Sequence, residues 1–151
     1  MENLTPDFSE ICEQYKSALI IILLNPLHQA PQLKALDTVI GQDVILRNGN
    51  QYLRSTSRDG YDFAFPVRQV FPFPIIAWSS ILNGKEVLCA VNLDENEAIE
   101  YVTIDDHMHS AGSKMRRVFG SNNSPNELNV ENRNGKAVRL TIPPVGFVMY
   151  E

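Results

Sequence analysis

The fold is decided by residues 75–92, IIAWSSILNGKEVLCAVN, in which two apolar runs flank the dipeptide Asn83-Gly84. Asparagine and glycine tolerate the positive φ values of a two-residue type I′ turn, so this stretch predicts a β-hairpin. Such a turn fixes the register of the pair and places Trp78 opposite Cys89. Both faces of the hairpin are then largely apolar, which indicates that it lies in the middle of a fold and is covered on both sides.

Short apolar stretches separated by turn residues continue from residue 49 to the end of the chain. Asn-Gly recurs at residues 48–49 and 134–135, and Asp59-Gly60 has similar chemistry. This spacing is typical of an all-β sandwich or barrel. Residues 121–134 are rich in Asn, Ser and Glu, so they are predicted to form an exposed loop. Further strands are expected at residues 51–55, 97–104, 114–119, 136–142 and 146–150.

The first 45 residues carry a helical pattern instead. From Thr5 to Leu24 apolar residues recur every three or four positions, as they do on one face of a helix, and Pro6 suits its first turn. A second, weaker helical pattern covers residues 31–39. We therefore predict a single structural domain, mainly β, in which an N-terminal helical segment (residues 1–45) packs on an antiparallel Greek-key-type β-sandwich (residues 46–151).

Composition and charge exclude several classes of protein. The chain has 44% hydrophobic and 21% charged residues and a net charge of −5, which is typical of a soluble globular protein and argues against binding to nucleic acid. The apolar run at residues 18–24 is much shorter than the roughly 20 residues that cross a bilayer. Acidic residues precede this run, whereas a secretory signal begins with a basic region. We expect a cytoplasmic protein that binds neither nucleic acid nor membrane.

Three stretches resemble a known family. Residues 46–54, LRNGNQYLR, look like the stretch that opens the C-terminal domain of many family 13 glycoside hydrolases, with Asn50 in place of the usual arginine. Residues 74–92 are similar to a strand pair of that family, with Ser80 again in place of arginine. Residues 143–150, PPVGFVMY, resemble its closing strand. The likeness is to the C-terminal all-β domain of the α-amylase superfamily.

What the resemblance implies is a sandwich that packs beside a (β/α)₈ barrel. The family's chemistry uses carboxylates at the ends of barrel strands, and no residue here matches a catalytic motif. We therefore expect a non-catalytic accessory module without a cofactor, which binds oligosaccharide weakly or docks on a glycosidase catalytic domain. The alternative is an interaction domain with no sugar-related role, which forms a homo-oligomer through the apolar face of the helix at residues 5–24.

Four aromatic residues are candidates for carbohydrate contact: Tyr61, Phe63, Phe71 and Phe73. They lie in a short, proline-containing stretch, and aromatic faces on a rigid loop can stack on sugar rings because pyranose C–H groups meet the negative π face. The more ordinary interpretation, which we favour, is that these rings cover the open edge of the sandwich or the junction with the N-terminal helix.

A second candidate is a metal site at Asp105, His107 and His109, since two imidazoles and a carboxylate can bind zinc. On a strand, the two histidines would point in the same direction. The segment lies where a predicted strand ends, however, so an exposed loop without a metal is the favoured interpretation.

Overall fold

The computed structural model describes residues 48–65, 75–92, 94–120, 123–144 and 146–151. Every strand pairing among them is antiparallel, which confirms a mainly β, antiparallel protein. No helix within this part of the chain has the length and apolar character needed to cross a membrane. The expected helices in residues 1–45 lie outside the described residues. The described strands are β1 Asn50–Arg54, β2 Thr56–Ser57, β3 Ile75–Leu82, β4 Lys85–Asn92, β5 Ala98–Ile104, β6 Lys114–Phe119, β7 Glu127–Asn129, β8 Lys136–Ile142 and β9 Phe147–Tyr150.

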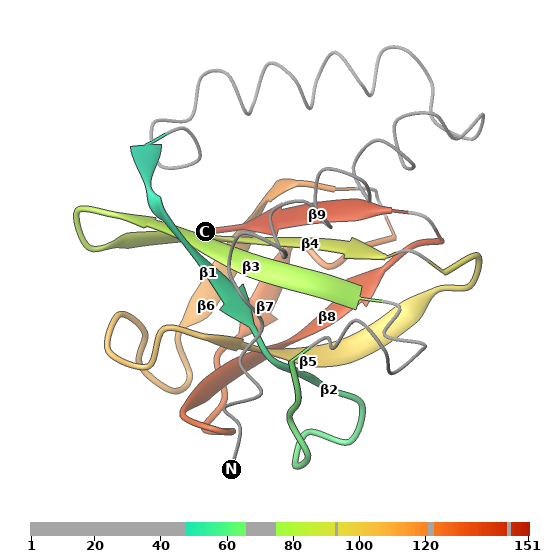
Figure 1. Cartoon of the computed structure of the whole chain (residues 1–151), viewed down its shortest axis with the longest axis horizontal. Coiled ribbons are helices and arrows are strands. Elements are labelled where there is room, and N and C mark those ends of the chain that lie inside the picture. The colour runs from blue at the N-terminus through green and yellow to red at the C-terminus, as the bar shows by residue number, and fades with distance from the viewer. Residues whose placement is uncertain (1–47, 66–74, 93, 121–122, 145) are drawn as a thin grey trace, which may run out of the picture.

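The strands form two sheets that lie in separate layers (Figure 1). The larger sheet has six strands in the order β1-β3-β4-β9-β6-β7, and the smaller has three in the order β2-β5-β8. The chain passes from the larger sheet to the smaller at Ser55, between β1 and β2. Thr103 of β5 fixes this corner, because its Oγ1 accepts from the Ser55 amide at 3.1 Å and its own amide donates to the Ser55 carbonyl at 3.1 Å. One continuous segment thus joins the two layers.

The hairpin formed by β3 and β4 has the predicted register. Trp78 pairs with Cys89, and the turn residues Asn83 and Gly84 have φ values of 51° and 74°. The hairpin is also buried on both faces, since Ala77 on one face and Cys89 on the other are each almost fully inaccessible. The sequence prediction for this element is therefore confirmed.

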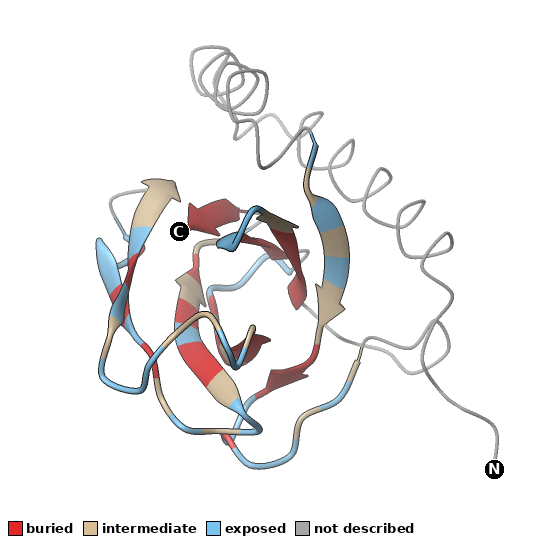
Figure 2. Ribbon diagram, turned by 90° about the vertical axis from the view of Figure 1, so that its left-hand side faces the viewer, coloured by how far each residue is buried: buried red, intermediate tan, exposed pale blue. Residues whose placement is uncertain are grey.

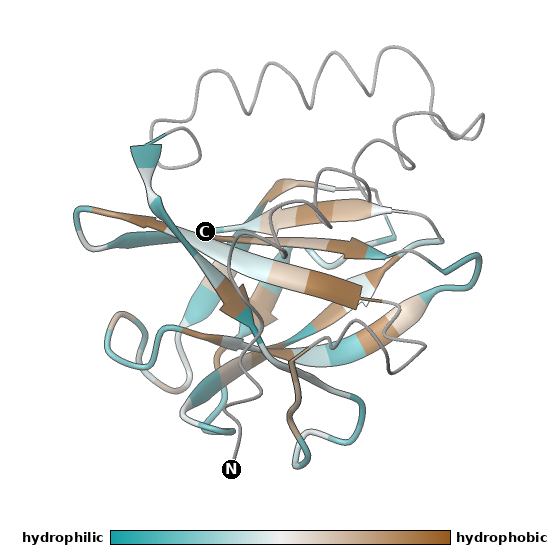
Figure 3. Ribbon diagram, viewed as in Figure 1, coloured by the Kyte–Doolittle hydropathy of each residue, from teal (hydrophilic) through white to brown (hydrophobic). Residues whose placement is uncertain are grey.

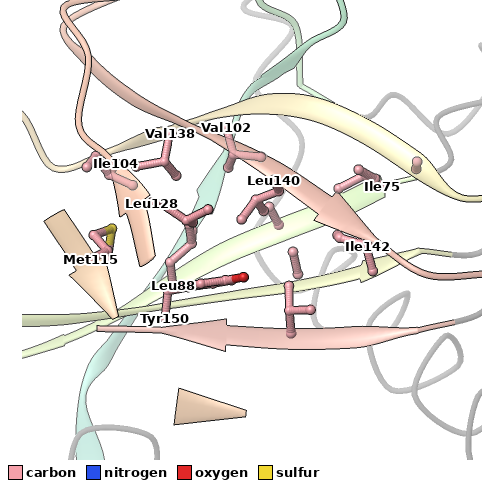
Figure 4. Packing of buried hydrophobic residues seen from close by; sticks show 14 of the residues in the cluster. Ile75, Leu88, Val102, Ile104, Met115, Leu128, Val138, Leu140, Ile142 and Tyr150 are labelled. Carbon is pink, nitrogen blue, oxygen red and sulfur yellow. The ribbon is translucent and has the colours of Figure 1, made fainter. Parts of the chain in front are cut away.

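The hydrophobic core lies between the two sheets (Figure 4). Leu88 and Tyr150 approach it from the larger sheet, while Val102, Val138 and Leu140 approach it from the smaller. Burial alternates with exposure along several strands (Figure 2), and hydrophilic residues gather at the turns that join them (Figure 3). This alternation follows from the period of two along a strand, which sends successive side chains to opposite faces.

One prediction from the sequence is wrong in part. Residues 121–134 are not simply an exposed loop, because they contain β7, whose Leu128 pairs with Met115 of β6. Ser124, Leu128 and Val130 are all buried. Leu128 and Val130 are isolated apolar residues in a polar segment, and their alternation is too short to predict a strand. The strand forms because the neighbouring β6 supplies its hydrogen-bonding partners.

Candidate functional site

A tightly bonded turn after β2 holds Tyr61 in solvent. The Oδ1 atom of Asp59 accepts hydrogen bonds from Ser57 Oγ at 2.8 Å, the Tyr61 amide at 2.8 Å and the Asp62 amide at 2.9 Å. The amide hydrogen bonds from Asp62 and Tyr61 lower the pKa of Asp59 to about 2. Gly60 takes a φ of 82° and donates its amide to Ser57 Oγ at 3.0 Å. Tyr61 is 80% exposed at the tip of this fixed turn.

Arg133 stacks between two tyrosine rings. Its guanidinium carbon lies 5.3 Å from the centroid of the Tyr61 ring and 4.6 Å from that of the Tyr101 ring on β5. Its Nη1 donates to the Gly60 carbonyl at 3.2 Å, and its Nε donates to Glu131 Oε1 at 3.3 Å. Cation–π contact and these hydrogen bonds hold the guanidinium in one orientation. The turn after β2 is thereby attached to the outer surface of the smaller sheet.

The loop that carries Arg133 is closed at its base. Backbone hydrogen bonds of 2.9 and 3.0 Å join Glu131 and Ala137 in both directions. Within the loop, Asn134 and Gly135 have φ values of 46° and 89°, which asparagine and glycine adopt at low cost. The Asn-Gly signal at residues 134–135 therefore corresponds to a real turn, and that turn places Arg133 over Tyr101.

The outer face of the smaller sheet continues this surface. On β5 the core-facing residues alternate with Ile99, which is 42% exposed, and with the half-buried Tyr101. Arg139 of β8 lies directly opposite Tyr101 and is exposed. Within the described part of the chain, no hydrogen bond or ion pair involves its side chain. We call the surface formed by Tyr61, Ile99, Tyr101, Arg133 and Arg139 the tyrosine–arginine face.

The tyrosine–arginine face presents an accessible aromatic ring. Arg133 covers one side of Tyr61, and with the residue 80% exposed most of its ring surface stays accessible. An accessible aromatic ring can stack on a pyranose, while nearby guanidinium groups donate hydrogen bonds to hydroxyls. The ring also sits on a fixed turn, so little conformational entropy is lost when a ligand binds.

Only part of the predicted aromatic cluster enters this site. Tyr61 belongs to it, Phe63 is half-buried beside it in sequence, and Phe71 and Phe73 lie outside the described residues. The prediction from sequence missed Tyr101, Arg133 and Arg139. The alternation of β5 could have placed Tyr101 on the outer face, but the pairing of β5 with β8 was needed to find its arginine neighbours.

The structure does not bring the three candidate metal ligands together. The His107 side chain is 91% exposed, and its Nε2 lies 3.4 Å from Asp106 Oδ1. His109 is largely enclosed and lies 2.6 Å from Glu86 instead. Asp105 uses Oδ1 to accept the amides of His107 and Met108, both at 2.9 Å. Among the described residues, no group of three or more His, Cys, Asp or Glu side chains could hold a metal ion.

His109 belongs to a buried network around Glu86 of β4. The Glu86 side chain is fully inaccessible and accepts from Arg54 Nη2 at 2.9 Å, His109 Nε2 at 2.6 Å and the Asp105 amide at 3.2 Å. Arg54 also donates from Nε to Ser79 Oγ at 2.8 Å. The network joins β1 and β4 of the larger sheet to the segment that follows β5 of the smaller sheet. Because these donors all bind the Glu86 carboxylate, the network is suited to holding the two sheets together.

The described residues thus define an antiparallel two-sheet β-protein with a buried carboxylate network and an exposed tyrosine–arginine face. No family model matches the chain, and no curated protein matches it. Among solved structures it is similar to the native form of the debranching enzyme of Nostoc punctiforme, at 15% identity and a TM-score of 0.49, over 76% of this chain and 19% of that one. It is also similar to the α-amylase of H. orenii, at 12% identity and a TM-score of 0.48, over 80% of this chain and 20% of that one.

The chain therefore spans about a fifth of the length of the solved structures that it matches. The resemblance predicted from residues 46–151 was to part of an α-amylase-like glycosidase, and the structural likeness is to part of such an enzyme.

Proposed function

We propose that this chain is a non-catalytic accessory module of the α-amylase superfamily and that its tyrosine–arginine face binds oligosaccharide weakly. We include in this proposal the Greek-key-type sandwich of residues 46–151, with the helical segment of residues 1–45 packed on it. The proposal depends on one observation above all: Arg133 is held between Tyr61 and Tyr101, while Tyr61 is 80% exposed on a fixed turn.

The state of the buried carboxylates supports a non-catalytic role. Hydrolysis of a glycosidic bond requires two carboxyl groups that flank the bond from opposite sides of an open cleft. The two glutamates buried in the described strands, Glu86 and Glu100, are each bound by their own arginine, Arg54 and Arg58 respectively. Neither of them belongs to the exposed tyrosine–arginine face.

Titration of the ¹⁵N-labelled chain with maltooligosaccharides, followed by amide NMR shifts, tests the proposal. We expect shifts at millimolar sugar that are confined to the turn at residues 57–62, to residues 99–101 and to residues 131–139. Exposed aromatic contacts of this kind give weak binding because little surface is buried. The absence of shifts, or shifts confined to another surface, would overturn the proposal.

A matched pair of variants tests whether the sugar-dependent shifts require the tyrosine–arginine face or only an exposed tyrosine next to an arginine. Tyr52 on β1 is 45% exposed and lies under Arg54, whose guanidinium carbon is 5.7 Å from the ring centroid. It therefore offers a similar Tyr–Arg pair on the other sheet. Tyr61→Ala should abolish the sugar-dependent shifts, and Tyr52→Ala should retain them. Equal loss in both variants would contradict the assignment.

A further inference from the structure

The side of the larger sheet that points away from the core is apolar and buried. Ile75 and the other core residues of β3 occupy odd-numbered positions, so its even-numbered residues point outward. Strand pairing places Cys89 of β4 and Met149 of β9 on the same side as Trp78. We call this surface the outer apolar face and define it by residues that are at most 9% exposed: Ile76, Trp78, Cys89, Val91, Phe147 and Met149.

Aromatic rings make the outer apolar face continuous from strand to strand. The ring centroids of Trp78 and Phe147 are 6.0 Å apart, and those of Phe147 and Phe119 on β6 are 6.1 Å apart. The face therefore extends from β3 across β4 and β9 to β6. Four neighbouring strands measure about 15 Å across.

The described strands do not account for the burial of this face. Within the described ranges, the strands that β3, β4 and β9 contact most are their neighbours in the larger sheet and β5 and β8 of the smaller sheet. β5 and β8 lie on the opposite side of the larger sheet, because their residues share the core with Leu88 and Tyr150. A sheet face without a second layer leaves its side chains open to water, whereas Cys89 is 1% exposed and Met149 is 0% exposed. Another part of the chain therefore covers the outer apolar face.

The predicted helix at residues 5–24 has the length and the apolar side for this position. A helix of about 20 residues is roughly 30 Å long, so it can cross all four strands. It is joined through residues 25–49 to β1, which is the neighbour of β3 in the same sheet. A single extended segment covers only about 5 Å of a sheet's width, so residues 66–74 offer too little surface. The apolar side of the helix carries residues spaced by three or four: Phe8, Ile11, Tyr15, Leu19 and Ile22.

We propose that the apolar side of the helix at residues 5–24 packs on the outer apolar face and shields Trp78 and Cys89 from solvent. This inference rests on the part of the proposed function that packs residues 1–45 on the sandwich, and it identifies the surface that receives them. It does not depend on sugar binding, which is assigned to the smaller sheet. Because the apolar side of the helix is used within its own chain, the protein is expected to be a monomer.

Nuclear Overhauser effects in the full wild-type chain test the packing without any substitution. We expect effects between the methyl groups of Leu19 or Ile22 and the indole ring of Trp78. A sample that mixes isotope-labelled and unlabelled chains distinguishes contacts within one chain from contacts between two copies, and sedimentation equilibrium gives the mass in solution. Contacts found only between chains would assign the face to a second copy and overturn the inference.

Thiol reactivity provides a second measurement, because Cys12 and Cys89 are the two cysteines of the sequence. In a Cys12→Ala background, Cys89 should react slowly with Ellman's reagent. Leu19→Asp places a charge on the apolar side of the helix, so it should detach the helix and raise the rate at least about tenfold. Ser17→Asp adds the same charge on the opposite side of the helix and should leave the rate unchanged.

Two further results would overturn the inference. Faster reaction of Cys89 in Phe71→Asp, with no change in Leu19→Asp, would assign the cover to residues 66–74. Absence of Overhauser effects between residues 5–24 and the outer apolar face would also refute it, and this measurement holds even where Leu19→Asp unfolds the whole chain. Sugar-dependent shifts on the tyrosine–arginine face are measured separately, so failure of sugar binding and failure of this inference are distinguishable.

Discussion

Glu86 and Glu100 are buried carboxylates whose pKa values are shifted in opposite directions. Burial works to raise the pKa of Glu86, but hydrogen bonds from His109 and Ser79 and the charge of Arg54 outweigh it and hold the pKa below its usual value. Burial raises the pKa of Glu100, and the hydrogen bond from Thr56 and the charge of Arg58 do not fully offset it. Arg58 is mostly exposed and lies 3.5 Å from Glu100, so water weakens its attraction.

The substitution Glu86→Gln should lower the free energy of unfolding at pH 7 by about 3 kcal/mol, because it leaves Arg54 without its buried partner. A carboxyl group whose folded-state pKa is depressed stabilises the protein above its unfolded-state pKa, here 4.5. That stabilisation is lost as the pH falls through the folded-state value. Urea denaturation at several pH values should therefore show the difference between variant and wild type shrinking below pH 4.5.

Glu100→Gln is the matched control on the smaller sheet. Its raised pKa means that the ionised form destabilises the fold, and this cost is present at neutral pH and disappears below the unfolded-state value of 4.5. The variant should thus be more stable than the wild type at pH 7 and equal to it in acid. Destabilisation of the same size in both variants would show that the loss of a buried glutamate, and not its charge balance, determines the effect.

Two turns that contain a glycine at positive φ differ in the space that surrounds the glycine. Gly84 in the β3–β4 turn has a φ of 74°, and an added Cβ would meet nothing within 4 Å. Gly60 has a φ of 82°, but its Cβ would lie 2.8 Å from Arg133 Nη1 and 3.1 Å from Tyr101 Cε2. Backbone strain is common to both positions, and crowding is specific to Gly60.

Gly84→Ala should therefore cost about 1 kcal/mol of stability through backbone strain alone, with no effect on the tyrosine–arginine face. Gly60→Ala carries the same strain and should also push the Arg133 guanidinium off the Tyr101 ring. The ring-current shift of the Arg133 Nε–H proton reports this displacement directly, and urea denaturation gives the stability of both variants. An unchanged Arg133 resonance in Gly60→Ala would contradict the described stack.

Local signals in the sequence predicted some of these elements and not others. The β3–β4 hairpin followed from Asn83-Gly84, because a two-residue turn fixes the register of its strands. The bounds of β6 and β8 also matched the expected residues 114–119 and 136–142. The two-residue β2 was missed, because it is too short to show any alternation and depends on β5 for its pairing.

The candidate site was only partly predictable for the same reason. Tyr61 stood out as an aromatic residue in a turn-rich segment, and its exposure agrees with a surface role. Tyr101 and Arg139 are 38 residues apart in the sequence, and no short turn relates their strands. Arg133 reaches Tyr101 only because the loop before β8 folds back over the sheet. Tertiary pairing, which one sequence does not specify locally, determines these contacts.

At the scale of the whole molecule, the larger sheet depends on its last strand. β9 pairs with β4 on one side and with β6 on the other (Figure 1), so it joins β1-β3-β4 to β6-β7. The hydroxyl of Tyr150 donates to the Pro125 carbonyl at 2.7 Å, and burial raises the pKa of Tyr150 to about 12. Glu151 extends the pairing through two backbone hydrogen bonds of 2.8 Å with Arg116.

Deletion of residues 147–151 should abolish cooperative unfolding, since it removes the strand that joins the two halves of the sheet along with three fully or nearly fully buried residues: Val148, Met149 and Tyr150. Circular dichroism melts and the dispersion of an amide NMR spectrum provide the measurement. Glu151→Ala, which keeps the backbone, should retain the melt of the wild type. A dispersed spectrum from the shortened chain would refute the central role of β9.

The position of β9 has a consequence for how the protein is made. Its partners β4 and β6 leave the ribosome well before it does, and the pairing of β4 with β9 joins segments about 60 residues apart. Until β9 emerges, the nascent polypeptide presents the open edge of β4, whose residues Val87–Val91 are otherwise buried. Such an edge can pair with the strands of other chains, so the nascent polypeptide is exposed to aggregation until β9 has emerged and paired with β4.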